Sequence, residues 1–166
     1  MTAYESELLR DHHQFDVFDC GKAELNDWLT DSARHCNRNN TARTFVWTEP
    51  GDSNVLAYYS LAAHLVEKNS VPPRLGRGSP EQCPVVLLAR LALDKTLHGQ
   101  RLGGVLLADA LDQVVRAVQN VAARFLIVDA IDEEAATFYE RYGFKRIPGD
   151  SRLFRKMSDI VAALEY

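Results

Sequence analysis

The sequence predicts a mixed α/β domain, and three segments of its 166 residues carry that prediction. The first is the continuous apolar run PVVLLARLALD at 84–94, which is typical of a buried central strand. A helical pattern follows at 103–118, where Leu107, Leu111, Val114 and Val118 recur at helical spacing. A second apolar run, ARFLIVDAI at 123–131, has the length of a strand. Together they indicate a strand–helix–strand unit at the centre of the domain.

The other elements follow from shorter patterns. Glycine, proline and polar clusters mark the turns, and alternating or helical apolar spacing marks the segments between them. We expect a strand at 4–9, a helix at 21–36, a hairpin from 42–49 and 54–67, a loop at 71–84, a helix at 132–142 and a last hairpin from 144–147 and 152–157. Asp132 is placed to cap its helix, and Gly143 is placed to end it.

The composition of the sequence restricts the class of protein to which it can belong. The length fits one domain over 1–166, the 46% apolar content is enough for a core, and the 25% charged content excludes a disordered chain. A net charge of −4 excludes a wholly basic nucleic-acid-binding protein but permits a local basic face. Without an apolar run of membrane length or a signal core, we expect a cytoplasmic protein that does not enter a membrane. Three widely spaced cysteines suggest reduced thiols.

The stretch LHGQRLGG at 97–104 lies between the central strand and the helix. Free amides at a helix N-terminus point at a ligand, and the helix dipole favours negative charge there. Gly99, Gly103 and Gly104 would let the backbone approach a pyrophosphate closely. The stretch matches neither the dinucleotide fingerprint nor a P-loop. From these residues alone, an anion site and a plain tight turn are equally good interpretations.

A second stretch, AATFYERYGF at 135–144, follows the next strand. This order of strand, turn, helix, strand and A-x-x-F-Y-x-x-x-G-F resembles the GNAT family of acetyl-CoA-dependent N-acetyltransferases. The resemblance implies a mostly antiparallel sheet with one parallel strand pair, flanked by helices. It also implies that acetyl-CoA binds to backbone amides. Those residues are Leu91, Ala92 and Leu93 for the acetyl and pantetheine groups, and His98, Gly99, Gln100, Arg101, Leu102, Gly103 and Gly104 for the pyrophosphate.

Two positions of the turn depart from the family pattern, Arg/Gln-x-x-Gly-x-Gly/Ala. His98 replaces the Arg or Gln, and Arg101 replaces the first glycine. Arg101 is compatible with the cradle if its φ is negative, because its amide then still donates, and its guanidinium can also pair with a phosphate. Asp132 stands where many members carry an Asn that contacts CoA, and capping is its expected role.

Tyr139 matches the general acid of the family. A tyrosine hydroxyl, with a pKa near ~10, can protonate a leaving thiolate whose acid has a pKa near ~8.5. Two alternatives stay open: Tyr139 packs in the core beside Phe138, or Tyr142 is the acid. Glu133 and Glu134 are explained as charges at a helix start, so no general base is evident. An α-amine is partly neutral at pH 7, so it can accept the acetyl group without a strong general base. This favours an α-amine over a lysine side chain as the acetyl acceptor.

The first half of the chain narrows the resemblance. FDCGKAELNDWL, TARTFVW and YYSLAA are similar to the acetyltransferase toxins of bacterial toxin–antitoxin modules. This resemblance implies acetylation of aminoacyl-tRNA, arrest of translation, a ribbon-helix-helix antitoxin as partner, and a homodimer. Two alternatives are a GNAT enzyme acting on a small amine or a protein N-terminus, and a CoA-binding module without turnover.

Basic residues occur in several segments of this acidic chain. Arg34, Arg38 and Arg43 near the first helix, and Arg155 in the last hairpin, are candidates for contacts with tRNA phosphates. The alternative for each is an ordinary solvated side chain. The histidines show no ligand spacing with cysteine or carboxylate, so we expect no metal.

Overall fold

A computed structural model describes residues 4–164 of the chain. It contains both strands and helices, as expected for a mixed α/β fold. In chain order the elements are β1 (Glu5–Leu8), α1 (Ala23–Asp31), α2 (Ala33–Arg38), β2 (Arg43–Thr48), β3 (Ala57–Glu67), η1 (Lys68–Ser70), α3 (Pro73–Gly76), β4 (Gln82–Leu93), η2 (Lys95–Leu97), α4 (Leu102–Val118), β5 (Phe125–Asp129), α5 (Glu133–Arg141), β6 (Lys145–Arg146), β7 (Arg152–Lys156) and α6 (Met157–Leu164).

The strands follow the order β1-β2-β3-β4-β5-β7-β6 in a seven-stranded sheet. The pairs β1–β2, β2–β3, β5–β7 and β6–β7 are antiparallel. The pair β4–β5 is parallel, in a register from Val85–Phe125 to Leu88–Val128. Its connection contains α4, as a parallel crossover requires. The predicted mixed fold, with a mostly antiparallel sheet and one parallel pair, is confirmed.

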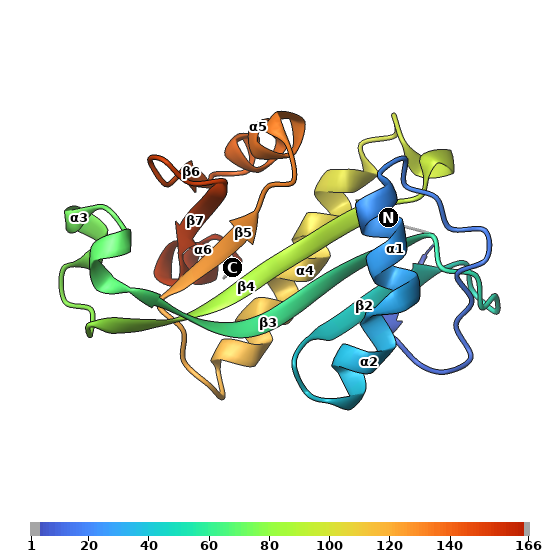
Figure 1. The fold of residues 1–166 in the computed structure, drawn as a ribbon, viewed down its shortest axis with the longest axis horizontal. Coiled ribbons are helices and arrows are strands. Elements are labelled where there is room, and N and C mark those ends of the chain that lie inside the picture. The colour runs from blue at the N-terminus through green and yellow to red at the C-terminus, as the bar shows by residue number, and fades with distance from the viewer. Residues whose placement is uncertain (1–3, 165–166) are drawn as a thin grey trace. The chain divides into compact units, whose positions relative to one another are not determined.

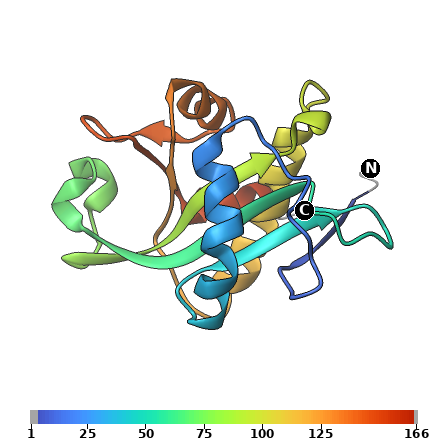
Figure 2. The same cartoon turned by 45° about the vertical axis from the view of Figure 1, so that its right-hand side comes forward.

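The chain divides into two compact units, which we call the first unit (1–62 and 90–110) and the second unit (63–89 and 111–166). In the first unit, α1 packs on the strands that Figures 1 and 2 show behind it. Leu29 of α1, Val46 of β2, Tyr58 of β3 and Ala92 of β4 are buried in one core cluster. The turn at 98–104 therefore follows a strand end that this core fixes.

The second unit has a core of its own. Alternate residues of β5, Phe125 and Ile127, face Val85 of β4 and Phe154 of β7. Leu126 and Val128, which lie between and beyond them on the other face of β5, are buried as well. Both faces of β5 are therefore covered, which is the reason for its continuous apolar run. The rings of Phe125 and Phe154 meet edge to face, with centroids 6.3 Å apart. The α5 helix and the β6–β7 hairpin belong to this unit (Figure 1).

Three sequence predictions of local structure are corrected. The helix at 21–36 is two helices, because Ser32 leaves the helical region with φ −126° between α1 and α2. The loop at 71–84 contains α3, whose helical turn begins at Pro73, and β4 already begins at Gln82. The α6 helix follows the last hairpin, and sequence analysis did not predict it. In residues 4–164 no helix is long and apolar enough to span a membrane.

Candidate active site

The turn after β4 is organised by its side chains. Buried Asp94 accepts hydrogen bonds from the amide and hydroxyl of Thr96, at 3.0 and 2.7 Å, which fixes the η2 turn. Nε2 of His98 donates to the Leu93 carbonyl at 2.9 Å. The Gln100 amide donates to the Thr96 carbonyl at 3.1 Å. Both side chains are therefore tied to the segment before the turn.

The α4 helix begins directly after this turn, at Leu102. The first amides of a helix have no acceptor within it, and the helix dipole adds positive potential at this end. Gly103 and Gly104 lie in the first turn of α4, and Gly99 has a φ of +78° with no atom within 4 Å of the point that a Cβ would occupy. The structure thus places the predicted pyrophosphate residues at the start of a 17-residue helix. That arrangement suits an anion.

Arg101 does not meet the condition of a negative φ, because its φ is +60°. This left-handed conformation suits glycine, and it costs an L residue about 1–2 kcal/mol. The family pattern has a glycine at this position, so the structure supplies the physical reason for that glycine. The side chain of Arg101 is exposed.

We predict that the Arg101→Gly variant is about 1 kcal/mol more stable to unfolding than the Arg101→Ala variant, because only glycine removes the strain of the left-handed conformation. Both variants lack the guanidinium, so the comparison isolates the backbone. Urea denaturation followed by circular dichroism measures the difference. Equal stability of the two variants would show that this conformation is not populated.

The three β4 residues predicted to bind the acetyl and pantetheine groups lie at the end of that strand. Ala92 is buried in the core of the first unit, and Leu91 and Leu93 are half-buried. The parallel pairing of β4 with β5 runs from Val85 to Leu88, and the three residues lie beyond it. The pairing with β5 therefore does not use their backbone amides.

Tyr139 lies in α5, whose first turn is held by Asp132. The Asp132 carboxylate accepts a hydrogen bond from the Ala135 amide at 2.8 Å, which confirms its capping role. Tyr139 is only 4% exposed and packs between Phe138 and Phe144, with ring centroids 5.3 and 5.7 Å away. Burial, and secondarily the charge of Asp129, raises the pKa of its hydroxyl. Tyr139 is therefore a protonated donor at any physiological pH.

Tyr142 occupies a different environment, since it is 39% exposed at the C-terminal end of α5. Gly143 follows it with φ +91° and ends the helix as predicted. One of the two glutamates at the start of α5, Glu133, is held in an ion pair. Arg146 pairs with Glu133 at 2.6 Å, and this pairing lowers the pKa of Glu133. Burial thus distinguishes the two tyrosines that the sequence left as alternatives.

The four arginines proposed for tRNA contacts lie in two places. Arg34, Arg38 and Arg43 line one pocket of about 300 Å³ in the first unit. Arg34 donates to the carbonyl oxygens of residues 11 and 13 and lies 4.4 Å above the Phe15 ring, so it holds the preceding loop. Arg43 donates to the Asn37 carbonyl at 2.9 Å. Arg38 is exposed.

Arg155, the fourth arginine, lies in the second unit and donates to the Tyr142 carbonyl at 3.4 Å. It lines a basic pocket together with residues of α3 and of the last hairpin. Sequence analysis named Arg155 in the last hairpin but had no signal that this hairpin meets α3, because the two segments are distant in the chain.

Sequence analysis also missed a cluster of Glu7, His12 and His13, whose possible ligand atoms lie within 4.8 Å of one another. Nδ1 of His13 accepts the Arg10 amide proton at 2.9 Å, so Nε2 carries the ring proton and donates to Glu7 at 2.8 Å. Both nitrogens of this buried imidazole are thus used within the protein. The cluster is accounted for as a structural hydrogen-bond network.

Comparisons with known proteins agree with this geometry. Residues 77–160 match the acetyltransferase (GNAT) domain family. The chain is 35% identical to the tRNA-acetylating toxin of Mycobacterium tuberculosis (strain ATCC 25618 / H37Rv), over 80% of this chain and 79% of that protein. The fold is similar to a mutant of KacT, with a TM-score of 0.90 and 27% identity over 98% of this chain and 100% of that one.

A second solved structure is AtaT complexed with acetyl-methionyl-tRNA. It has a TM-score of 0.88 and 30% identity, over 98% of this chain and 99% of that one. The chain described here therefore belongs to the GNAT family of acetyltransferases.

Proposed function

We propose that this protein transfers the acetyl group of acetyl-CoA to the α-amine of aminoacyl-tRNA and thereby stops translation. The observation that carries the proposal is the similarity, over nearly the whole chain, to a toxin solved with acetyl-methionyl-tRNA. The similarity to a protein named tRNA-acetylating toxin points the same way. The sequence prediction of an acetyl-CoA-dependent N-acetyltransferase is confirmed by these relatives and by the family match.

The first unit supplies the groups proposed to hold acetyl-CoA. The pyrophosphate binds to the amides of the turn and of the first turn of α4, from His98 to Gly104, where the helix dipole stabilises its charge. The amides of Leu91–Leu93 bind the pantetheine arm and polarise the acetyl carbonyl, as oxyanion donors do. The unpaired helix start and the position of these strand residues beyond the β5 pairing support this assignment.

Tyr139 is proposed to act on the leaving group. The amine nitrogen attacks the thioester carbonyl, a C–N bond forms and the C–S bond breaks, and the thiolate takes the Tyr139 proton. Because burial raises the pKa of Tyr139, proton transfer to a half-formed thiolate is unfavourable. The hydroxyl therefore donates a hydrogen bond to the sulfur first and transfers its proton when the thiolate is fully developed.

The amine proton needs no dedicated base in this proposal. An α-amine titrates near ~8, and a substantial fraction is neutral at pH 7. An aminoacyl ester lacks the neighbouring carboxylate, so its amine titrates lower still. The ion pairing of Glu133 with Arg146 supports this assignment, because it engages one of the two carboxylates at the start of α5.

We also propose that this protein binds two protein partners. The first is a ribbon-helix-helix antitoxin, supported by the solved complex of AtaT with the C-terminus of the antitoxin AtaR. The second is another copy of this chain, in a homodimer, as the toxin branch of the family implies. Co-purification with the antitoxin and the mass of the complex in solution test these two proposals.

The test of function is incubation with labelled acetyl-CoA and a mixture of charged and uncharged tRNA. Label should enter charged tRNA alone and leave with the amino acid after mild base, because the ester bond hydrolyses before the new amide. Binding through six or more phosphates should weaken by orders of magnitude between ~50 and ~200 mM salt. Label on lysine side chains or on free amines, with tRNA untouched, would instead identify an enzyme for small amines or protein N-termini.

A further inference from the structure

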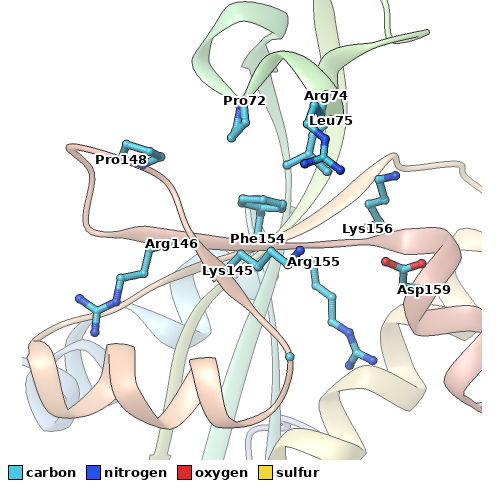
Figure 3. Close-up of a pocket in the computed structure, with 11 residues that line it drawn as sticks. Pro72, Arg74, Leu75, Lys145, Arg146, Pro148, Phe154, Arg155, Lys156 and Asp159 are labelled. Atoms are coloured by element: carbon cyan, nitrogen blue, oxygen red, sulfur yellow. The ribbon is translucent and has the colours of Figure 1, made fainter.

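A pocket of about 440 Å³ lies in the second unit, between α3 and the β6–β7 hairpin. Figure 3 shows Pro72, Arg74 and Leu75 on the α3 side, across from Phe154 on the hairpin. Five of its eleven lining residues are basic. They are Arg74, Lys145, Arg146, Arg155 and Lys156, and Asp159 is the acidic one among the eleven. The protein as a whole has a net charge of −4, so this concentration of cations is local.

Most of this positive charge is not neutralised by residues 4–164. Arg146 is the exception, since it pairs with Glu133 at 2.6 Å and with Glu140 at 2.9 Å. Arg155 donates to the carbonyl oxygen of Tyr142. Arg74, Lys145 and Lys156 make no ion pair within residues 4–164. Like charges held together from separate segments repel one another, so an anion that enters the pocket relieves that repulsion.

The position of the pocket relative to Tyr139 identifies the anion. Gly143 lines the pocket and lies just beyond the end of α5, where the amide of the next residue, Phe144, donates to the Tyr139 carbonyl at 3.2 Å. If the aminoacyl group reacts beside Tyr139, the nucleotide strand that carries this group passes close to the pocket. The anions of the tRNA nearest to the aminoacyl group are the phosphates of the tRNA backbone.

We propose that this pocket binds the backbone phosphates next to the aminoacylated 3′ end of the tRNA, an inference that rests on the proposed function. Guanidinium and ammonium groups are the usual protein partners of phosphate oxygens. The pocket reads no base, because phosphate contacts position a nucleic acid without specifying its sequence. Its contribution is to binding, so it acts on KM and leaves the chemical step at Tyr139 unchanged.

The test combines two substrates with two kinds of variant. Arg74→Gln and Lys145→Gln, separately and together, remove pocket cations that are exposed and make no ion pair within the described part of the chain. Arg116→Gln is the matched control, because it removes an exposed cation of the same unit that pairs with Asp112 on α4. The substrates are aminoacyl-tRNA and an aminoacyl-adenosine, which carries the same reactive amine without a backbone phosphate.

With aminoacyl-tRNA as substrate, kcat/KM of the double variant should fall on the order of tenfold or more. The fall should come from a higher KM, with kcat unchanged. The slope of log affinity against log salt should fall by ~0.7 for each lost contact. Acetylation of the aminoacyl-adenosine should not change in any variant, and Arg116→Gln should resemble the wild type on both substrates.

Other outcomes overturn the inference and can be told apart. Equal losses on both substrates would mean that the variants disturb the catalytic centre. Unchanged acetylation of aminoacyl-tRNA, with lost binding of the antitoxin, would assign the pocket to an acidic peptide. Wild-type protein that acetylates neither substrate would refute the proposed function, whereas wild-type activity on both without any effect of the pocket variants would refute the pocket alone.

Discussion

Replacement of Tyr139 by phenylalanine should lower the rate of acetyl transfer by about 10²–10⁴-fold, the usual contribution of a general acid. The change removes only the hydroxyl, so the leaving thiolate loses its proton donor. Acetyl-CoA affinity should stay the same, because the proposed binding groups are backbone amides of the first unit. The effect should therefore appear in kcat under saturating acetyl-CoA, measured with labelled donor and charged tRNA.

Stability gives an independent check on the same variant. The Tyr139 hydroxyl makes no hydrogen bond to residues 4–164, and its ring packs against Phe138 and Phe144. Phenylalanine keeps those ring contacts and removes a buried polar atom, so the melting temperature should not fall. Tyr142→Phe is the control, because this exposed ring lies one position beyond the end of the same helix. A greater loss of turnover in Tyr142→Phe would make Tyr142 the acid.

Much of the fold could be predicted from the sequence, because its strongest signals are local. The central strand, the α4 helix and the Asp132 cap depend on spacing and on residues within one turn of each other. The α6 helix was missed although Met157 and Ile160, both buried, have helical spacing. The short segment follows a predicted strand directly, without a turn residue that would mark a new element. Residue spacing alone did not separate it from that strand.

The candidate site could be predicted only in part. The sequence identified Tyr139 and the turn, since both lie in short motifs. It could not give the left-handed φ of Arg101, because only the path of the backbone through the turn decides it. Nor could it separate arginines that hold loops, such as Arg34, from arginines in an open basic pocket, such as Arg74. That distinction depends on segments that meet in space and are distant in the chain.

The Gly103→Asp variant should bind acetyl-CoA at least on the order of 100-fold more weakly, because it brings a carboxylate to the proposed pyrophosphate site. Gly103 lies in the first turn of α4 and has helical backbone geometry, so a side chain there is compatible with the local conformation. An acidic residue in the first turn of a helix is also favourable for the helix dipole. The variant should therefore fold at least as well as the wild type while losing its ligand.

Gly103→Asn is the matched control, because asparagine has nearly the same size as aspartate and no charge. If the site binds an anion, the asparagine variant should lose less affinity than the aspartate variant, and the gap between them should shrink as salt screens the added charge. Titration calorimetry with acetyl-CoA at low and high salt measures both effects. Equal losses in the two variants would indicate steric exclusion alone, and unchanged affinity in Gly103→Asp would place the pyrophosphate elsewhere. Only a charge-dependent loss supports the turn at 98–104 as the cradle for acetyl-CoA.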